Sequence, residues 1–203
     1  THSTSSAASD VYKRQGNYLQ VKNQRVRVIS GGEPGTIPWD ALQADVVIDA
    51  TGRFLTREKL ARHLESGAKR VFLTRNPKNN IDRYVIPGIN ESSISASDKI
   101  ISTTSSTTQV LALMVKMLDE AFGLQRAMMT TVHAYTADQP LADAAGADLR
   151  RSRSAVENII PNTTKAPDLV KKIMPQYEGK IEGIAFNVPV PNGSCVDLTT
   201  ELE

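Results

Sequence analysis

A run of hydroxyl side chains between an apolar segment and a helix-forming segment is the first feature that could carry chemistry. In IISTTSSTTQVLAL (residues 100–113), two isoleucines lead into eight small or polar residues, and apolar residues follow at once. This order predicts a buried strand, a turn and a helix start, where side chains and free backbone N–H groups converge. Ser106 in this turn and His133, near the end of a later predicted strand, are a candidate nucleophile and base.

The same residues also allow a purely structural interpretation. Ser105 and the neighbouring threonines have the side chains that cap helices, and His133 is equally compatible with a core position. No G-x-S-x-G sequence surrounds Ser106, which argues against a serine hydrolase. The spacing alone leaves both interpretations open.

A second candidate site is a polar connection rich in arginine and threonine. Guanidinium groups and hydroxyls together suit a phosphate group, although a solvated charged loop fits the same pattern. Cys195 has no base near it in the sequence and is expected to be structural. The residues of this candidate anion site are Arg150, Arg151, Arg153, Thr163, Thr164 and Lys165.

The bulk composition excludes several classes of function. The 203 residues carry 24 basic and 22 acidic side chains; without residues 1–15, which hold Lys13, Arg14 and Asp10, 22 basic residues face 21 acidic ones. This near-neutrality argues against a nucleic-acid partner. No apolar run reaches the roughly 18 residues that indicate a membrane span, so no membrane partner is expected. A single cysteine excludes an intramolecular disulfide framework and fits a reducing, cytoplasmic location.

Both ends of the sequence look cut. THSTSSAAS holds six Ser or Thr in nine residues, and its composition differs sharply from that of the rest of the chain. We interpret residues 1–15 as a foreign or disordered tail that takes no part in the fold. The other end, CVDLTTELE, stops within an alternating strand pattern. The sequence therefore reads as a piece of a longer protein.

The order of apolar segments predicts two kinds of sheet. Alternating strands at 18–23 and 25–30 precede short, almost wholly apolar strands that alternate with two amphipathic helices, which indicates parallel strands with crossovers. After Gly123 the strands are longer and alternate in polarity, which favours an antiparallel sheet in a second domain. The expected strands of the first kind are 44–52, 69–74, 84–90 and 100–105, with helices at 56–68 and 109–123; those of the second kind are 127–136, 179–190 and 194–203, with a helix at 167–174.

Several of these segments resemble glyceraldehyde-3-phosphate dehydrogenase of the phosphorylating, nicotinamide-dependent kind. The similarity is collinear over residues 18–203, and several of its motifs are highly specific. Its motifs are DATGRF, FLTRNPKN, ISTTSSTTQ, MMTTVHAYTADQ, DLRRSRSAVENIIPNTT and VPVPNGSCVDL.

This resemblance implies the fold class and the domains. The fold is α/β, a partial doubly wound Rossmann-type parallel sheet followed by an α+β catalytic domain with a mainly antiparallel sheet. Residues 16–103 would form the C-terminal part of the nicotinamide-binding domain, and residues 104–203 the first part of a truncated catalytic domain. The Gly-rich dinucleotide fingerprint would lie before this sequence.

The resemblance also assigns catalytic roles. Ser106 stands where the family has the cysteine whose thiolate attacks the aldehyde, and His133 matches the base that lowers the pKa of that thiol. Gln109 stands where the family has asparagine. A serine hydroxyl is not ionised at rest, and phosphate would have to cleave an oxygen ester rather than a thioester. The parent activity is therefore expected to be impaired.

Phosphate-binding residues are implied by the same resemblance. Two of them depart from the family: Asn187 replaces an arginine, and Lys165 replaces a glycine. The lost arginine removes a fork-shaped phosphate contact, which the lysine replaces as a point charge. The residues expected to bind substrate phosphate or inorganic phosphate are Ser105, Thr107, Thr136, Asp138, Arg153, Thr164, Lys165 and Asn187.

The cofactor expected from the resemblance is NAD or NADP, and no metal ion is expected. The choice between the two nicotinamides depends on a residue after an early strand that precedes this sequence. Homo-oligomers of the full-length protein, a phosphorylated aldehyde and inorganic phosphate complete the implied partners, with a role in glycolysis. The expected cofactor contacts are Thr51, Gly52, Arg53, Phe54 and Thr74.

Two functions remain open at this stage. The first is a dehydrogenase-like enzyme weakened by serine at the nucleophile position, and the second is a non-catalytic paralogue that binds nucleotide or phosphate. A sequence error at Ser106 is a third explanation. The separate departures at Gln109, Lys165 and Asn187 argue against a single misread codon.

Overall fold

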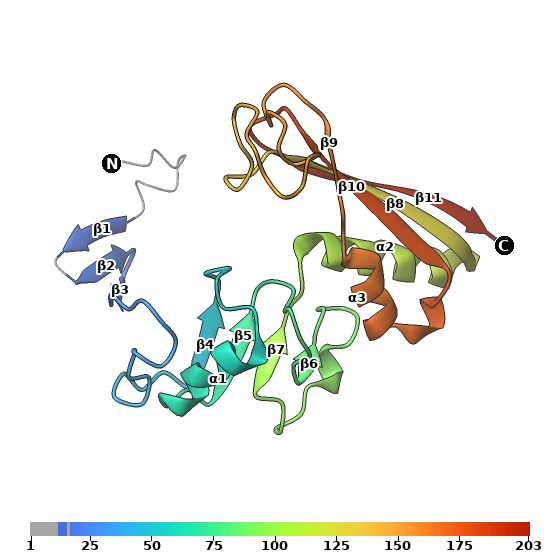
Figure 1. Ribbon diagram of the computed structural model, residues 1–203. Coiled ribbons are helices and arrows are strands. Elements are labelled where there is room, and N and C mark those ends of the chain that lie inside the picture. The colour runs from blue at the N-terminus through green and yellow to red at the C-terminus, as the bar shows by residue number, and fades with distance from the viewer. Residues whose placement is uncertain (1–11, 16) are drawn as a thin grey trace.

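The computed structural model describes residues 12–15 and 17–203 (Figure 1). At its N-terminal side, β1 (Tyr12–Gln15), β2 (Tyr18–Val21) and β3 (Gln24–Arg27) form an antiparallel sheet. The two strands expected at 18–30 are confirmed. Residues 12–15 differ from expectation: their backbone pairs with β2 and so extends the hairpin. The rest of the expected tail, residues 1–11, lies outside the described residues.

A parallel four-stranded sheet follows, as the apolar strands predicted. Its strands are β4 (Val46–Asp49), β5 (Arg70–Leu73), β6 (Arg83–Tyr84) and β7 (Ile100–Ser102), in the order β4-β5-β7-β6. Thr56 is the N-cap of the helix α1 (Arg57–Glu65), and its hydroxyl accepts from the Lys59 N–H. After the helix the chain turns at Gly67, with φ of 108°. Leu60 of this helix packs with Val71, Leu73 and Ile100 in a separate core.

One predicted strand is shorter than expected. The segment 84–90 contributes only its first residue to β6, and a 3₁₀ turn (η2, Glu91–Ser93) comes after it. The Asn90 side chain explains the change, because it accepts from the Ile86 N–H and donates to the Tyr84 carbonyl. These local bonds satisfy the backbone that a longer strand would have paired.

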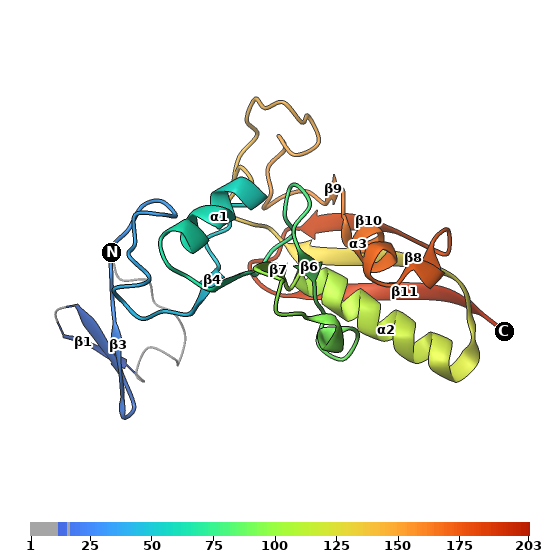
Figure 2. The ribbon, with the colours of Figure 1, turned by 90° about the horizontal axis from the view of Figure 1, so that it is seen from below.

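The second half is a sheet with two helices on one face (Figure 2). Its strands run in the order β11-β8-β10-β9. The expected mainly antiparallel sheet is confirmed: two of its three pairings are antiparallel, and β8 pairs with β10 in parallel. A crossover through α3 returns the chain in the direction of β8. The elements are α2 (Ser106–Phe122), β8 (Leu124–Ala134), β9 (Ile160–Asn162), α3 (Ala166–Ile173), η3 (Pro175–Tyr177), β10 (Ile181–Val188) and β11 (Ser194–Leu202).

The larger core lies between this sheet and its helices. Leu111 and Val115 of α2 are fully buried against Met129 and Ile181 of the strands. At the edge of this core the Tyr177 hydroxyl donates to the Asp119 carboxylate at 2.8 Å. Burial and this hydrogen bond raise the pKa of Tyr177 to about 12. Among the described helices, none is long and apolar enough to cross a membrane.

Candidate functional site

The hydroxyl turn joins β7 to α2, and its side chains divide into two groups. Ser105 is the helix N-cap, with its hydroxyl 3.2 Å from the Thr108 N–H and 2.8 Å from the Thr108 hydroxyl. Thr104 before it is buried at a left-handed φ of 63°, a strained conformation for a threonine. Ser106 is the exposed first residue of the helix and takes no part in the cap. The capping interpretation therefore holds for Ser105 and Thr108 and leaves Ser106 free.

His133 lies near the end of β8 and faces this turn. Its Nε2 is 2.8 Å from the Thr131 hydroxyl and 3.4 Å from the Thr107 hydroxyl. Thr107 directly follows Ser106, so the turn and the imidazole converge as the sequence predicted. Within the described part of the chain, no hydrogen bond joins Ser106 to His133. The imidazole contacts threonine hydroxyls rather than the candidate nucleophile.

Thr136 and Asp138 form a polar cluster just beyond β8. The Thr136 hydroxyl donates to the Asp138 carboxylate, whose other oxygen accepts from Arg151 Nη2 at 2.6 Å. The Thr136 hydroxyl is the main cause of a lowered pKa at Asp138; burial opposes it, and the Arg151 charge adds to it. The Thr136 hydroxyl and the Arg151 guanidinium, two donors suited to an anion, are thus already bonded to the Asp138 carboxylate.

The guanidinium at this cluster belongs to Arg151 and not to Arg153, the residue expected from the resemblance. Arg153 pairs with Asp143 at 3.0 Å, and the Ser154 N–H binds the same carboxylate. That pairing fixes Arg153 outside the cleft. Arg151 was among the loop arginines of the candidate anion site, but its spacing alone gave no reason to prefer it.

Asn187 and Lys165 both line the cleft, but Asn187 is buried and Lys165 is exposed. Asn187 is buried; its amide donates to the Ala134 carbonyl, and its oxygen accepts from Asn162, both at 3.1 Å. These bonds occupy both ends of the amide. Thr164 Oγ1 accepts from the Ala166 N–H, and Lys165 is exposed at the start of α3. Of these three side chains, the lysine supplies the cation.

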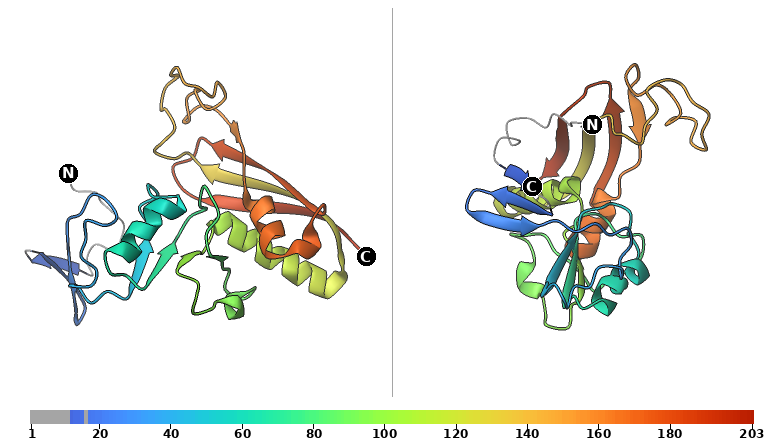
Figure 3. Two further views of the ribbon diagram at one scale, coloured as in Figure 1. Left: turned by 60° about the horizontal axis from the view of Figure 1, so that its bottom comes forward. Right: turned by 90° about the vertical axis from the view of Figure 1, so that its left-hand side faces the viewer.

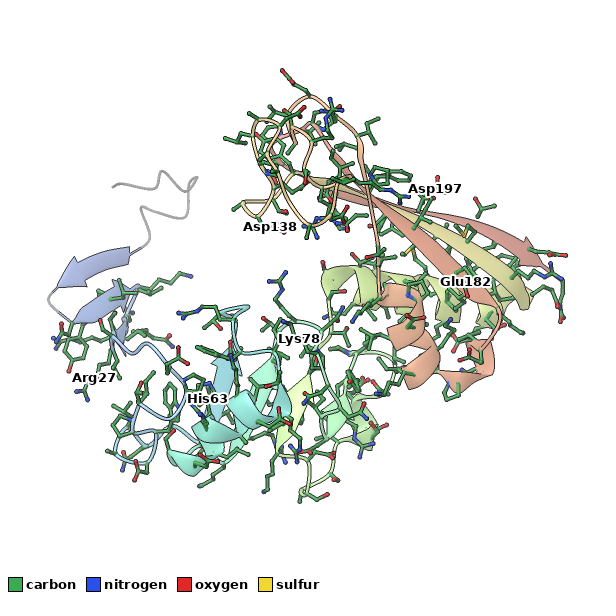
Figure 4. All side chains as sticks on the ribbon, viewed as in Figure 1. Arg27, His63, Lys78, Asp138, Glu182 and Asp197 are labelled. Atoms are coloured by element: carbon green, nitrogen blue, oxygen red, sulfur yellow. The ribbon has the colours of Figure 1, made fainter. Side chains whose placement is uncertain are left out.

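These groups line one cleft of about 1110 Å³, open to solvent. Arg75 and Asn76, at the carboxyl end of β5, close it from the parallel-sheet side, and Asn76 Oδ1 is buried without a partner. Sequence reasoning missed both, although the end of a parallel strand is a general signal for a ligand site. In Figure 4, Asp138 on the loop after β8 and Lys78 on the parallel-sheet half lie on opposite sides of the space between the halves. Site residues in the lining are Ser105, His133, Thr136, Asp138, Arg151, Thr164, Lys165 and Asn187; Ser106, Thr107 and Arg153 are not in it.

The expected cofactor residues lie at the carboxyl ends of β4 and β5. Thr51 donates to Asp49 Oδ1 through its N–H at 2.9 Å and its hydroxyl at 2.7 Å. Gly52 has a left-handed φ of 69°, which favours glycine, and a Cβ there would have to displace the end of the Arg75 side chain, 2.7 Å away. The exposed backbone of this turn suits the close approach of a dinucleotide. Phe54 is buried in the smaller core and packs there.

Comparison with known proteins places the chain in a family. The profile of "Glyceraldehyde 3-phosphate dehydrogenase, C-terminal domain" matches residues 105–203. The chain is 42% identical over 196 residues to glyceraldehyde-3-phosphate dehydrogenase A, chloroplastic, of Scenedesmus vacuolatus, covering 96% of this chain and 62% of that protein. It is 43% identical to glyceraldehyde-3-phosphate dehydrogenase of Geobacillus stearothermophilus, over 93% of this chain and 56% of that protein. For glyceraldehyde-3-phosphate dehydrogenase 2 of Bacillus subtilis the identity is 44%, over 91% and 54%.

The parallel sheet, the mixed sheet and the cleft define an α/β protein whose candidate ligand site is the cleft lined by residues of both halves. The chain belongs to the glyceraldehyde-3-phosphate dehydrogenase family. It spans little more than half the length of the curated relatives that it matches.

Proposed function

We propose that the protein acts as a glyceraldehyde-3-phosphate dehydrogenase-like oxidoreductase on a phosphorylated aldehyde, with NAD or NADP and inorganic phosphate, and with its activity reduced by serine at the nucleophile position. The observation that carries the proposal is the single cleft that gathers Ser105, His133 and Thr136 with the cations of Arg151 and Lys165. We further propose that residues 16–103 belong to the nicotinamide-binding domain and residues 104–203 to the catalytic domain of a longer, homo-oligomeric protein. The family match that starts at residue 105 supports this division.

Each side chain has a defined task in this proposal. The Ser106 oxygen bonds to the aldehyde carbon while its proton passes to His133. The turn brings Thr107, the residue after Ser106, beside this imidazole. Thr136, Arg151 and Lys165 hold the phosphate groups through hydroxyl and cationic contacts. The turn at Thr51 and Gly52 would hold part of the nicotinamide cofactor, which would supply the hydride acceptor when bound. Phosphate then displaces Ser106 from the oxidised carbon and returns the hydroxyl proton through His133.

Serine makes this sequence of steps slow for two reasons. A cysteine thiol has a pKa of about 8.5 and is readily ionised beside an imidazolium, whereas a serine hydroxyl is not. The Ser106 hydroxyl also lacks a hydrogen bond to His133, whose Nε2 contacts Thr131 instead. Losing a nucleophile that works together with its base costs several orders of magnitude in rate.

A non-catalytic, phosphate-binding paralogue is the second candidate. The observation that favours it is a contrast: Lys165 and Arg151 line the cleft as cations, while Ser106 lies outside the lining and is not bonded to His133. Phosphate affinity without turnover would distinguish this candidate from a slow enzyme.

A steady-state assay on the full-length parent protein tests the proposal. Glyceraldehyde 3-phosphate, phosphate and either nicotinamide should give weak turnover, and Ser106→Cys should raise it by several orders of magnitude. Adding Asn187→Arg should raise it further, and Lys165→Gly gives room for that guanidinium. Turnover that stays absent in both variants, with phosphate binding intact, would favour the non-catalytic paralogue.

The isolated 203-residue chain should bind NAD weakly or not at all. The expected contacts comprise only the edge turn after β4 and Thr74 after β5, and no Gly-rich phosphate cradle occurs among the 203 residues. Calorimetry that shows micromolar NAD binding by this chain would contradict this expectation.

A further inference from the structure

Two buried polar side chains in the parallel-sheet half are used neither by the cleft nor by the core. Asp49 at the end of β4 is 3% exposed, and His63 of α1 is 6% exposed. Figure 4 shows His63 in the parallel-sheet half, between α1 and the segment that precedes β4. Asp49 Oδ2 and His63 Nε2 lie 3.6 Å apart, and neither atom has a hydrogen-bond partner. Buried polar atoms left in this way are costly and call for a functional explanation.

Trp39 determines which nitrogen of His63 carries the proton. The indole Nε1–H is a donor only, and it lies 3.1 Å from His63 Nδ1. Nδ1 must therefore accept, so the neutral imidazole carries its proton on Nε2, the atom nearest Asp49. The present separation of 3.6 Å between His63 Nε2 and Asp49 Oδ2 is longer than a hydrogen bond, and a small closing movement would join the imidazole to the carboxylate.

Asp49 in turn holds the turn that follows β4. Its Oδ1 accepts from both the N–H and the hydroxyl of Thr51, and the Thr51 hydroxyl accepts from the Arg53 N–H at 3.2 Å. The chain of contacts runs from Trp39 through His63 and Asp49 to Thr51. It links a loop before the sheet to the Gly52 turn.

Few other charged groups face this chain of contacts. The two polar side chains border a cavity of about 190 Å³ whose other charged residues are Glu33 and Arg53. These two pair with each other at 3.6 Å and are largely exposed. Asp49 is therefore the buried charge closest to His63, and its influence on the imidazole is only weakly screened.

We propose that His63 is a positioning residue for the Thr51–Gly52 turn, acting through Asp49. Its buried imidazole lies 3.6 Å from one oxygen of the Asp49 carboxylate, and the other oxygen accepts from the N–H and the hydroxyl of Thr51. The proposal rests on the proposed function only in taking this turn to be the expected cofactor contact.

Amide hydrogen exchange tests the positioning role independently of any cofactor. His63→Leu leaves Asp49 without its neighbour, and the amides of Thr51 and Arg53 should exchange about tenfold faster. His63→Gln keeps an N–H donor beside Asp49, so it should preserve the protection. Lys59→Gln, on the exposed side of the same helix, is the matched control. Unchanged exchange in folded His63→Leu would overturn the positioning role, whether or not the protein proves to be a dehydrogenase.

Discussion

The substrate side of the cleft and the turn after β4 are built in opposite ways. The substrate side gathers residues that are far apart in the sequence, from Ser105 to Lys165, onto α2, β8 and the loop that projects beyond the sheet (Figure 3). The turn after β4 uses neighbouring residues, Asp49 to Arg53, joined by hydrogen bonds within the turn. The first depends on the packing of a whole domain, whereas the second is held mainly by local bonds and one buried histidine.

This difference teaches where changes in the chain act. Ser106 is exposed at the start of α2 and takes no part in the cap, so a change of side chain there leaves Ser105 capping the helix. By contrast, Gly52 has a left-handed φ of 69°, and any other residue there would be strained and would displace the end of the Arg75 side chain. A change at position 106 therefore alters the chemistry of the turn, whereas a change at position 52 alters its conformation.

The largest expected effects come from shortening one buried side chain in each of the two cores. Leu111→Ala removes a fully buried side chain of α2 and should lower the free energy of unfolding by about 2–5 kcal/mol, with loss of the substrate side of the cleft. Leu60→Ala should do the same to the parallel-sheet half. Thermal unfolding should be followed by tryptophan emission and by circular dichroism. The unfolding transition reported by Trp39 emission should shift more in Leu60→Ala than in Leu111→Ala. Identical loss of both signals in both variants would show that the halves unfold as one unit.

Anion binding distinguishes Arg151 from Arg153, two of the three arginines of the loop. Arg151→Ala and Lys165→Ala should each weaken sulfate or phosphate binding by about 1–2 kcal/mol, or about five- to thirtyfold in Kd, because each removes a cation that lines the cleft. Arg153→Ala is the matched control and should leave the affinity unchanged, since Arg153 pairs with Asp143. Calorimetry that gives the reverse ranking would restore Arg153 as the phosphate ligand. An unchanged affinity in Lys165→Ala would show that the lysine does not replace the lost arginine.

The Tyr177–Asp119 hydrogen bond predicts a pH dependence of the larger core. The pKa of Tyr177 is raised to about 12, so the stability that it contributes is complete below about pH 10 and is lost as pH rises through about 12. The Leu124 N–H and then the Tyr177 hydroxyl lower the pKa of Asp119, so its contribution is lost as pH falls through that lowered value. Tyr177→Phe should cost about 1 kcal/mol at neutral pH and remove the alkaline loss. Urea unfolding across this pH range would measure both effects.

The smallest expected effect concerns Asp138. Its carboxylate engages Thr136 and Arg151, so an anion has to displace it. Asp138→Asn keeps an acceptor for Thr136 but removes the charge, and sulfate should bind about two- to fivefold more tightly. In the unmodified chain, protonation of Asp138 at low pH should reproduce part of this gain. Weaker binding in the variant would instead mean that Asp138 orients Arg151 for the anion.

Much of the fold was predictable because its signals are local. Thr56 and Gly67 delimit α1, and apolar runs mark β4, β5 and β7, so the parallel sheet follows from periodicity. The strand predicted at 84–90 is wrong beyond Tyr84, because the Asn90 side chain satisfies backbone groups that a longer strand would pair. The short β9, which contains Pro161, and the parallel β8–β10 pairing depend on tertiary context that no local pattern encodes.

The sequence led to the candidate site by two routes. His133 stands out because it lies near the end of a predicted strand, and Thr136 follows from the family resemblance; both line the cleft. The resemblance also indicates Arg153, whereas Arg151 lines the cleft; spacing alone does not separate these arginines, because their carboxylate partners depend on how the loop folds. The Trp39–His63–Asp49 contacts join residues from three segments and were not foreseen, since a buried histidine has no distinctive spacing.

Alkylation of an introduced thiol tests most directly whether the hydroxyl turn and His133 form a dehydrogenase-type site. Ser106→Cys in a Cys195→Ser background leaves one thiol, at the N-terminus of the 17-residue helix α2 and near His133. The helix N-terminus and the imidazolium both favour the thiolate, so iodoacetamide should react far faster than with a free cysteine at neutral pH. Adding His133→Ala should slow the reaction. A thiol no faster than free cysteine, and indifferent to His133→Ala, would contradict a dehydrogenase-type site and leave the turn as a helix cap.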